Sequence, residues 1–252
     1  MRVILGISYD GKDFCGWQIQ PNGRTVQETV EVALNKLTGE KIALTGSGRT
    51  DSGVHALCQI AHFDTNSSIP PDKFANALNG LLPDDVQVLF SVQAKNDFHS
   101  RFGAKKKTYL YPAYVSDVKL PLLEPYAQRV VSKIDVKKMQ LGAKYIEGTH
   151  DFRCFLAANS SVKDTVRTVY FCRVKQKGNK ITIEICGNGF LYNMVRTVAG
   201  TLFSVGEGKI APEEVKSIIE SKSRKMAGKT MPAKGLMLKN VQYKGIKFPK
   251  IY

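Results

Sequence analysis

A glycine-rich segment at residues 46–56, with the sequence GSGRTDSGVHA, carries the side chains best suited to chemistry. Arg49 and Asp51 lie two positions apart, so in extended backbone their side chains share one face. The glycines permit backbone angles and close approaches that bulkier residues resist. The segment is longer than a tight hairpin needs, and long loops on rigid scaffolds often carry function. Asp51 is therefore a candidate nucleophile or base.

Three other interpretations of this segment compete with a catalytic carboxylate. A phosphate-binding loop requires a Lys-Ser/Thr ending, for which Arg49-Thr50 is a poor substitute. An aspartic protease pairs two carboxylates, but the triplet Asp51-Ser52-Gly53 occurs once in the chain. A plain turn with an ion pair between Arg49 and Asp51 would carry no chemistry. The loop alone leaves this last interpretation open.

Arg196 is a second unusual residue, because it lies in an apolar segment at residues 190–203 with the sequence FLYNMVRTVAGTLF. A helix that is apolar around most of its circumference is normally buried. An unpaired buried guanidinium is very costly, so Arg196 needs a carboxylate, a phosphate or a path to solvent. Pairing with Asp51 would keep that carboxylate ionised and oriented. This pairing is a hypothesis, and a surface-facing arginine is the alternative.

Cations and aromatic rings alternate in residues 98–111, with the sequence FHSRFGAKKKTYLY. Such a pattern suits a nucleic-acid groove, where cations contact phosphates and a ring stacks on an unpaired base. Tyr109 and Tyr111 would share one face of a strand, and Pro112 implies an edge or a bulge. A solvated basic loop that leads into an ordinary strand is the alternative. The candidate phosphate contacts are Arg101, Lys105, Lys106 and Lys107.

Charge is unevenly distributed along the chain. The 37 lysines and arginines exceed the 22 acidic residues, for a net charge of +15. Residues 1–104 contain nine basic and eleven acidic residues, which leaves 28 basic and eleven acidic residues in 105–252. Such an excess indicates a polyanionic partner such as nucleic acid, because cations that neutralise phosphates release condensed counterions. A protein that is merely basic is the alternative.

Composition predicts a globular cytoplasmic protein without a metal or nucleotide cofactor. Hydrophobic residues make up 43% of the chain, and the mean hydropathy is −0.19. We find no leader pattern and no apolar run that could span a bilayer, so no membrane association is expected. The five cysteines form no C-x-x-C pair, and the four histidines do not cluster with them, so neither a disulfide scaffold nor a zinc site is expected.

Hydrophobic periodicity predicts two similar halves, residues 1–104 with the loop 46–56 and residues 105–252. The first half is predicted to contain strands at 2–9, 41–45, 59–64 and 86–92, a helix capped by Thr25 and Gly39, and a helix at 70–82. The second is predicted to contain strands at 108–115, 166–174, 180–186 and 236–243, a helix capped by Asp135, and helices at 190–205 and from Pro212. The expected class is α+β, with two split β-α-β (ferredoxin-like) halves whose antiparallel sheets flank a central cleft.

Together these segments resemble the bacterial tRNA pseudouridine synthase A family in order across nearly the whole chain. The catalytic-loop resemblance in residues 48–56 is highly specific, and Pro112 stands where that family usually has an aliphatic residue. The segments that carry the resemblance are Tyr9-Asp10-Gly11 with 14–20 and 25–27, the loop 48–56, residues 98–101 with 107–111, the helix 189–196, and residues 233–236.

The resemblance implies a pseudouridine synthase fold and a cofactor-free homodimer that isomerises uridine in the anticodon stem-loop of tRNA, at positions 38 to 40. It implies that Asp51 is the essential aspartate, Tyr109 stacks on the target base, Arg196 pairs with Asp51, and Arg49 helps to extrude the base. The carboxylate would attack C6 or C1′, or remove the C2′ proton, and the sequence does not choose among these. A non-catalytic RNA-binding module that presents Tyr109 and Tyr111 is the main alternative, and a protease is a distant one.

Overall fold

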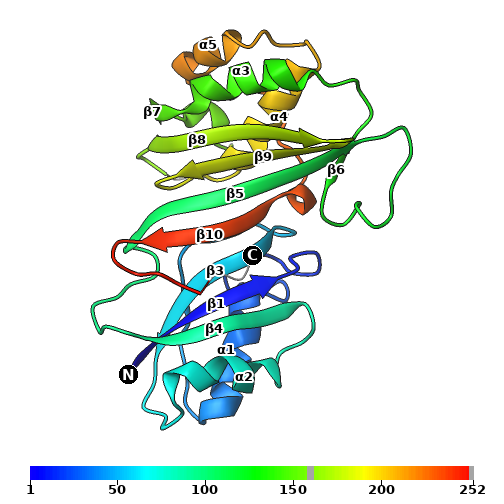
Figure 1. Ribbon diagram of the computed structural model, residues 1–252. Helices are drawn as coiled ribbons and strands as arrows, with labels where there is room; N and C mark the ends of the chain where they lie inside the picture. Colours follow the sequence, from blue (N-terminus) through cyan, green and yellow to red (C-terminus); the bar gives the residue numbers. More distant parts are fainter. Residues whose placement is uncertain (158–161, 250–252) are drawn as a thin grey trace. The chain divides into compact units, whose positions relative to one another are not determined.

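The computed structural model describes residues 1–157 and 162–249 (Figure 1). The chain forms two compact units, which are described separately. Unit 1 consists of Met1–Lys105 together with Met237–Tyr252, and unit 2 of Lys106–Leu236. The sequence-based division instead assigned the C-terminal segment to the second half. That segment groups with unit 1 because its strand, β10 (Met237–Tyr243), pairs in parallel with β3 (His55–Asp64).

Unit 1 contains the predicted split β-α-β arrangement. Strand β1 (Arg2–Tyr9) lies between β3 and β4 (Val86–Ala94) and is antiparallel to both. The short β2 (Thr45–Gly46) pairs with the other edge of β3, also antiparallel. Helix α2 (Phe74–Asn79) packs on β4 and contacts α1 (Val26–Thr38) (Figure 1). This arrangement holds the loop between β2 and β3 on a rigid frame.

Helix α1 begins and ends where its capping residues predict. The Thr25 hydroxyl accepts a hydrogen bond from the backbone N–H of Glu28, which satisfies one of the donors left over at a helix N-terminus. Gly39 follows the helix in the left-handed conformation, with φ 73°. The buried residues Val26, Val30, Ala33 and Leu34 form its inner face, so the predicted helix is confirmed.

Two predicted elements of unit 1 are shorter than expected. Residues 41–44 form no ladder, because α1 side chains take their backbone donors: Asn35 Oδ1 accepts from Ile42 N at 2.7 Å, and Glu31 Oε1 accepts from Leu44 N at 2.8 Å. The helix predicted at 70–82 is a 3₁₀ turn (Pro71–Lys73) followed by α2. The side chain of Asn79, the last residue of α2, bonds both backbone groups of Val88 in β4.

Strands β5 to β9 of the sheet belong to unit 2, with helices packed against them. The strand order is β5 (Ala104–Val115), β9 (Lys180–Gly187), β8 (Val166–Lys177) and β7 (Gly148–Asp151), all antiparallel. β6 (Gln128–Val130) adds to β5 in parallel. The β5–β9 register continues without a shift through Pro112, opposite Thr182, so the bulge considered for Pro112 is not formed.

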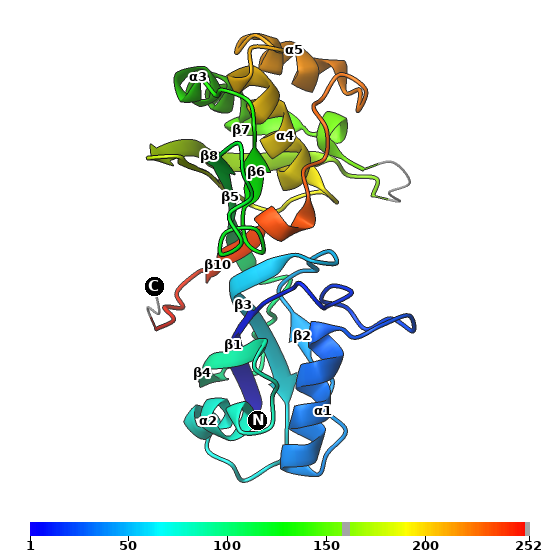
Figure 2. The same cartoon turned by 90° about the vertical axis from the view of Figure 1, so that its right-hand side faces the viewer.

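In the described part of unit 2, residues 106–157 and 162–236, the α-helices are α3, α4 and α5. Helix α3 (Val136–Ile146), capped by Asp135 as predicted, packs against β8 and contacts both α4 (Met194–Gly206) and α5 (Glu214–Ser221). Figure 2 shows these three helices gathered beside the strands. No helix in 1–157 or 162–249 has the length and apolar character needed to cross a membrane. The architecture is α+β, as predicted.

Candidate active site

The loop between β2 and β3 holds Asp51 in unit 1. Asp51 is half-buried, Arg49 is exposed and Thr50, between them, is buried. The Thr50 hydroxyl lies 2.8 Å from the Tyr9 hydroxyl at the end of β1. The Thr50 carbonyl accepts a hydrogen bond from Trp17 N at 3.1 Å. Thr50 is thus held through both its side chain and its backbone. This restrains the backbone of its two charged neighbours, Arg49 and Asp51.

The turn after Asp51 is closed by hydrogen bonds to its own residues and to the segment after β1. The Asp51 carbonyl accepts from Val54 N at 3.1 Å, and the Phe14 carbonyl accepts from Gly53 N at 3.3 Å. The Ser52 hydroxyl donates to the same Phe14 carbonyl at 3.2 Å. These hydrogen bonds hold the backbone of the turn that carries Asp51 in one conformation.

Gly16 allows the segment after β1 to reach this loop. It has φ 99°, and a Cβ added to it would lie 2.7 Å from the Thr50 carbonyl oxygen and 3.2 Å from the carbonyl carbon of Asp51. Only glycine combines this backbone conformation with so close an approach. The glycine thus brings residue 16 into direct contact with the backbone of Thr50 and Asp51.

Buried polar groups beneath the loop are hydrogen-bonded. Gln59 in β3 is fully buried; its Nε2 donates to the Gly48 carbonyl at 2.9 Å, and its Oε1 accepts from the Ser47 hydroxyl. Burial raises the pKa of Tyr9 well above its usual range, so its hydroxyl remains neutral at physiological pH. His55 Nδ1 accepts a hydrogen bond from Gly11 N at 3.0 Å. These contacts hold the loop in place, and the neutral Tyr9 hydroxyl adds no negative charge near Asp51.

Arg196 lies in the first turn of α4 in unit 2. Most residues of the helix are buried, as its apolar sequence predicts, and Arg196 itself is half-buried. Its Nε donates to the Met231 carbonyl at 2.7 Å, and its Nη1 donates to Asn193 Oδ1 at 2.6 Å. The guanidinium is therefore oriented from two sides, and its partly exposed side chain leaves the surface-facing alternative open.

Asn193 explains why α4 begins later than predicted. This residue adopts the left-handed conformation, with φ 61° and ψ 3°, so the helix starts at Met194 instead of near residue 190. Few non-glycine residues adopt the left-handed conformation, and those that do are found more often than expected at functional sites. The unusual backbone places the Asn193 side chain against the guanidinium of Arg196.

The segment that supplies the Met231 carbonyl packs tightly on α4. A Cβ added to Gly200 would lie 1.8 Å from the Lys229 carbonyl oxygen, so only glycine permits the approach. Gly228 N donates to the Thr201 hydroxyl at 2.9 Å, and Met231 N donates to the Arg196 carbonyl at 3.2 Å. Arg196 thus exchanges two hydrogen bonds with Met231, one through its side chain and one through its backbone.

The two tyrosines of β5 have different environments. The Tyr109 ring, largely buried, meets Phe190 edge-on with ring centroids 5.3 Å apart. Tyr111 is fully buried, and its hydroxyl donates to the Pro232 carbonyl at 2.9 Å. A base cannot stack on Tyr111 unless this packing is lost. The alternative of an RNA-binding module that presents both rings is therefore weakened.

The predicted basic residues are mostly accessible. Arg101 and Lys105 in unit 1 and Lys106 in unit 2 are exposed, while Lys107 is half-buried. The Lys106 ammonium lies 4.7 Å from the ring centroid of Tyr170 in β8, a cation–π contact. Sequence reasoning did not find Tyr170, because the pairing depends on the distant strand β8.

The candidate residues divide between the units: Arg49 and Asp51 belong to unit 1, and Tyr109 and Arg196 to unit 2. Unit 1 offers a carboxylate in a fixed loop, and unit 2 offers an oriented guanidinium and a ring. A carboxylate can act as a nucleophile or a base, and an aromatic ring can stack on an unpaired base. Within 1–157 and 162–249, no group of three or more histidine, cysteine or acidic residues is arranged to hold a metal ion.

Comparison with known proteins places the chain in a family. The sequence model of a family described as tRNA pseudouridine synthase matches residues 7–103 and 143–244. A tRNA pseudouridine synthase A of Acetivibrio thermocellus is 49% identical over 242 residues, which covers 96% of this chain and 99% of the relative. Those of Clostridium acetobutylicum and Bacillus subtilis are each 47% identical, with the same coverage.

With the α+β architecture, these matches define the class as a pseudouridine synthase, an isomerase. The chain belongs to the tRNA pseudouridine synthase family. A chain of the solved structure described as a Cbf5-Nop10-Gar1 complex aligns over 94% of this chain and 48% of its own length, with 14% identity and a TM-score of 0.39.

The sequence identified the charged and aromatic candidates but assigned no role to the residues that hold them. Thr50 and Gln59 act through hydrogen bonds across β1 and β3, which a single sequence does not reveal. Asn193 could have been noticed, since asparagine is one of the few residues that tolerate the left-handed region.

Proposed function

We propose that this protein converts uridine to pseudouridine in the anticodon stem-loop of tRNA, at positions 38 to 40, with Asp51 as the catalytic carboxylate. The observation that carries the proposal is similarity of 44% to 49% identity over nearly the whole chain to proteins named tRNA pseudouridine synthase A. The fixed loop around Asp51 supports the role of this residue. The basic second half of the sequence fits a polyanionic substrate.

The reaction needs few protein groups. The N1–C1′ bond of uridine breaks, the uracil turns, and C5 bonds to C1′; the C5 proton then leaves to solvent and N1 takes up a proton. Asp51 would attack C6 or C1′, or remove the C2′ proton. The uracil is conserved through the reaction, so the overall change is an isomerisation without an external group donor.

Arg196 is proposed to pair with the carboxylate of Asp51. Its guanidinium is already oriented by Asn193 Oδ1 and the Met231 carbonyl. A guanidinium beside a carboxylate favours the ionised form and fixes its geometry. An attacking or proton-accepting carboxylate requires both.

The target nucleotide must leave its stack before Asp51 can reach it, which costs a few kcal/mol. We propose that Tyr109 stacks on the extruded base and that Arg49 helps to extrude it. Stacking on an aromatic ring contributes about 1–3 kcal/mol per base. The cations of residues 101–107 would hold the flanking phosphates: the exposed Arg101, Lys105 and Lys106, and the half-buried Lys107.

Replacing Tyr109 by phenylalanine should retain RNA binding. The edge-on contact with Phe190 needs only the ring, so affinity for an anticodon stem-loop should change less than about threefold, whereas Tyr109→Leu should lose about 5- to 100-fold. Fluorescence anisotropy with a labelled stem-loop measures both. Equal losses in the two variants would contradict a stacking role, and normal binding by an inactive Tyr109→Phe protein would assign proton transfer to the hydroxyl.

Replacing Gly16 by alanine should displace the catalytic loop. The new Cβ would meet the backbone of Thr50 and Asp51, and a displacement of about 1 Å can lower turnover about 100-fold. Gly39→Ala is the matched control, because Gly39 also has positive φ but its added Cβ would meet nothing within 4 Å. Both variants should lose about 1 kcal/mol of stability or more. Equal turnover in the two would show that the contact at Gly16 does not position Asp51.

Release of tritium from C5-labelled uridine in tRNA tests the function directly. An isomerase releases the label as the new C5–C1′ bond forms, whereas a pure RNA-binding module releases none. Mapping pseudouridine on a single transcript then tests positions 38 to 40. Absence of release from several unmodified tRNAs would overturn the proposal, and pepstatin-sensitive proteolysis would support the distant alternative.

We also propose that the protein acts in the cytoplasm and forms a homodimer. Both rest on the family relationship and on the tRNA substrate. Sedimentation equilibrium at micromolar concentration should give twice the chain mass of 27.9 kDa. A single 27.9 kDa species that is fully active would contradict the dimer.

A further inference from the structure

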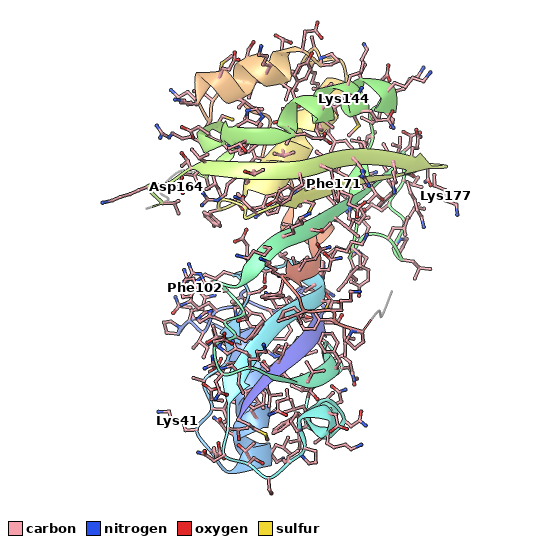
Figure 3. The ribbon with its side chains drawn as sticks, turned by 60° about the vertical axis from the view of Figure 1, so that its left-hand side comes forward. Lys41, Phe102, Lys144, Asp164, Phe171 and Lys177 are labelled. Carbon is pink, nitrogen blue, oxygen red and sulfur yellow. The ribbon has the colours of Figure 1, made fainter. Side chains whose placement is uncertain are left out.

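The segment between β4 and β5 exposes a large aromatic side chain that the proposed chemistry does not use. Phe102 is 74% exposed, and its neighbour Arg101 is also exposed. Figure 3, in which Phe102 is labelled, shows it on the segment that leads into β5. Single exposed rings are common on protein surfaces, but neighbouring groups hold this ring in a defined position.

Ser100 anchors the segment to the sheet of unit 1. It is fully buried, and its hydroxyl donates to the Thr45 carbonyl at 2.6 Å. The Tyr243 hydroxyl donates to the Ser100 carbonyl at 2.6 Å. His62 Nδ1 lies 2.8 Å from the Ser100 hydroxyl. The base of the segment is therefore tied to β2, β3 and β10.

His62 contributes no charge to this anchor at physiological pH. Burial, followed by the nearby Arg2 and His99, lowers the pKa of His62 to about 4. His62 Nδ1 accepts the backbone N–H of Ser100 at 3.3 Å, and the Ser100 hydroxyl donates to the Thr45 carbonyl. The anchor is thus a chain of neutral hydrogen bonds between buried groups.

His99 supports the exposed ring from below. The centroids of His99 and Phe102 are 4.3 Å apart, with the planes tilted by 34°. His99 Nδ1 also accepts the backbone N–H groups of Arg101 and Phe102, at 3.2 and 3.3 Å. One side of the Phe102 ring therefore rests on a fixed imidazole, while most of the residue's surface faces solvent. The Arg101 guanidinium carbon lies 5.7 Å from the ring centroid.

We propose that Phe102 is a stacking platform for an unpaired base of the RNA substrate, and that Arg101 binds the phosphate beside that base. The inference deepens the proposed function and rests on RNA as the substrate. A largely exposed ring that rests against an imidazole, with a guanidinium over the ring, combines the aromatic surface and the cation that bind unpaired nucleotides. A protein partner fits less well, because the flanking residues Lys105, Lys106 and Lys107 are cationic and the apolar area is one ring.

Affinity for a stem-loop RNA tests the platform. Phe102→Ala should bind an unmodified anticodon stem-loop about 5- to 100-fold more weakly, and Phe102→Trp should bind at least as well as the wild type. Val32→Ala is the control, since Val32 is 61% exposed on α1 beside Glu31 and lies outside the basic segment. The control should bind normally. Normal binding by Phe102→Ala would overturn the inference.

Salt dependence separates the two roles. Arg101→Ala should lower the slope of log affinity against log salt by about 0.7, as expected for one lost phosphate contact on single-stranded RNA. Phe102→Ala should leave the slope unchanged while it lowers affinity at every salt concentration. A changed slope in Phe102→Ala would overturn the stacking assignment, because it would mean that the variant acts through charge.

A paired RNA of equal length and tritium release complete the test. The loss in Phe102→Ala should disappear with a fully paired duplex, which offers no unpaired base, and an equal loss would overturn the inference. Weaker self-association of Phe102→Ala, with normal RNA binding, would assign the ring to a dimer contact and also overturn it. Absence of tritium release by the wild type would refute the isomerase, whereas the platform is judged on binding alone.

Discussion

Asp51→Asn is expected to abolish conversion of uridine to pseudouridine, with turnover lower by about 10⁴-fold or more, because the attacking or proton-accepting group is removed. The amide is nearly the same size as the carboxylate, so the hydrogen bonds of the Asp51 backbone to Val54 and of Thr50 to Trp17 remain. Affinity for tRNA should fall less than about tenfold, because most binding energy comes from phosphates and stacking. Single-turnover tritium release measures the chemistry, and anisotropy measures the binding.

Two further substitutions sharpen this result. Asp64→Asn is the matched control: it makes the same chemical change in the ion pair with Arg2 and should leave turnover unchanged. Asp51→Glu keeps a carboxylate but moves it by one methylene, so it should retain a small fraction of the activity. Turnover by Asp51→Asn at more than a tenth of the wild-type rate would remove Asp51 from the chemistry and leave the loop as a plain turn.

The parts of the fold that could be predicted are those specified by local chemistry. Thr25 and Gly39 set the ends of α1, and Asp135 sets the start of α3. The turn between β8 and β9 was predicted at residues 177–179, where Gly178 has φ 61°. In each case the residues that form the contact lie within a few positions of each other.

The parts that could not be predicted depend on distant partners. Residues 41–44 have buried Ile42 and Leu44 in alternation, as a strand would, but their backbone donors bond to side chains of α1. β10 groups with unit 1 through its pairing with β3, far away in sequence. A single sequence carries the alternation but not the identity of the partner.

The candidate site follows the same rule. Asp51 stood out because its chemistry is concentrated in one short loop, and Arg196 because a cation in an apolar helix is unusual. The side chains that position them were not predicted. Thr50 is held by Tyr9 and Trp17, and Arg196 by Asn193 and Met231, through contacts formed only in the folded chain.

Arg196→Met should lower turnover by about 10²–10³-fold, the loss typical of removing one oriented electrostatic group. Methionine keeps the apolar stem of the side chain, so α4 should remain packed. Binding of tRNA should fall less than turnover, because the proposed partner of Arg196 is Asp51 and not a phosphate. A loss confined to binding, with normal turnover at saturating tRNA, would make Arg196 a phosphate contact instead.

Asn193 separates the orientation of the guanidinium from its charge. Asn193→Gly keeps the left-handed backbone and removes the side-chain acceptor, whereas Asn193→Ala adds backbone strain of about 1 kcal/mol or more. If Asn193 Oδ1 orients the guanidinium, both variants should lose turnover to a similar degree. The loss should be about tenfold, as expected for a charged hydrogen bond worth at least 1.5 kcal/mol, and only the alanine variant should also lose stability.

The acidic limb of the pH–rate profile should move to higher pH in Arg196→Met, since a carboxylate without its cation is protonated more readily. An unmoved limb would show that the charge of Arg196 does not act on the catalytic acid.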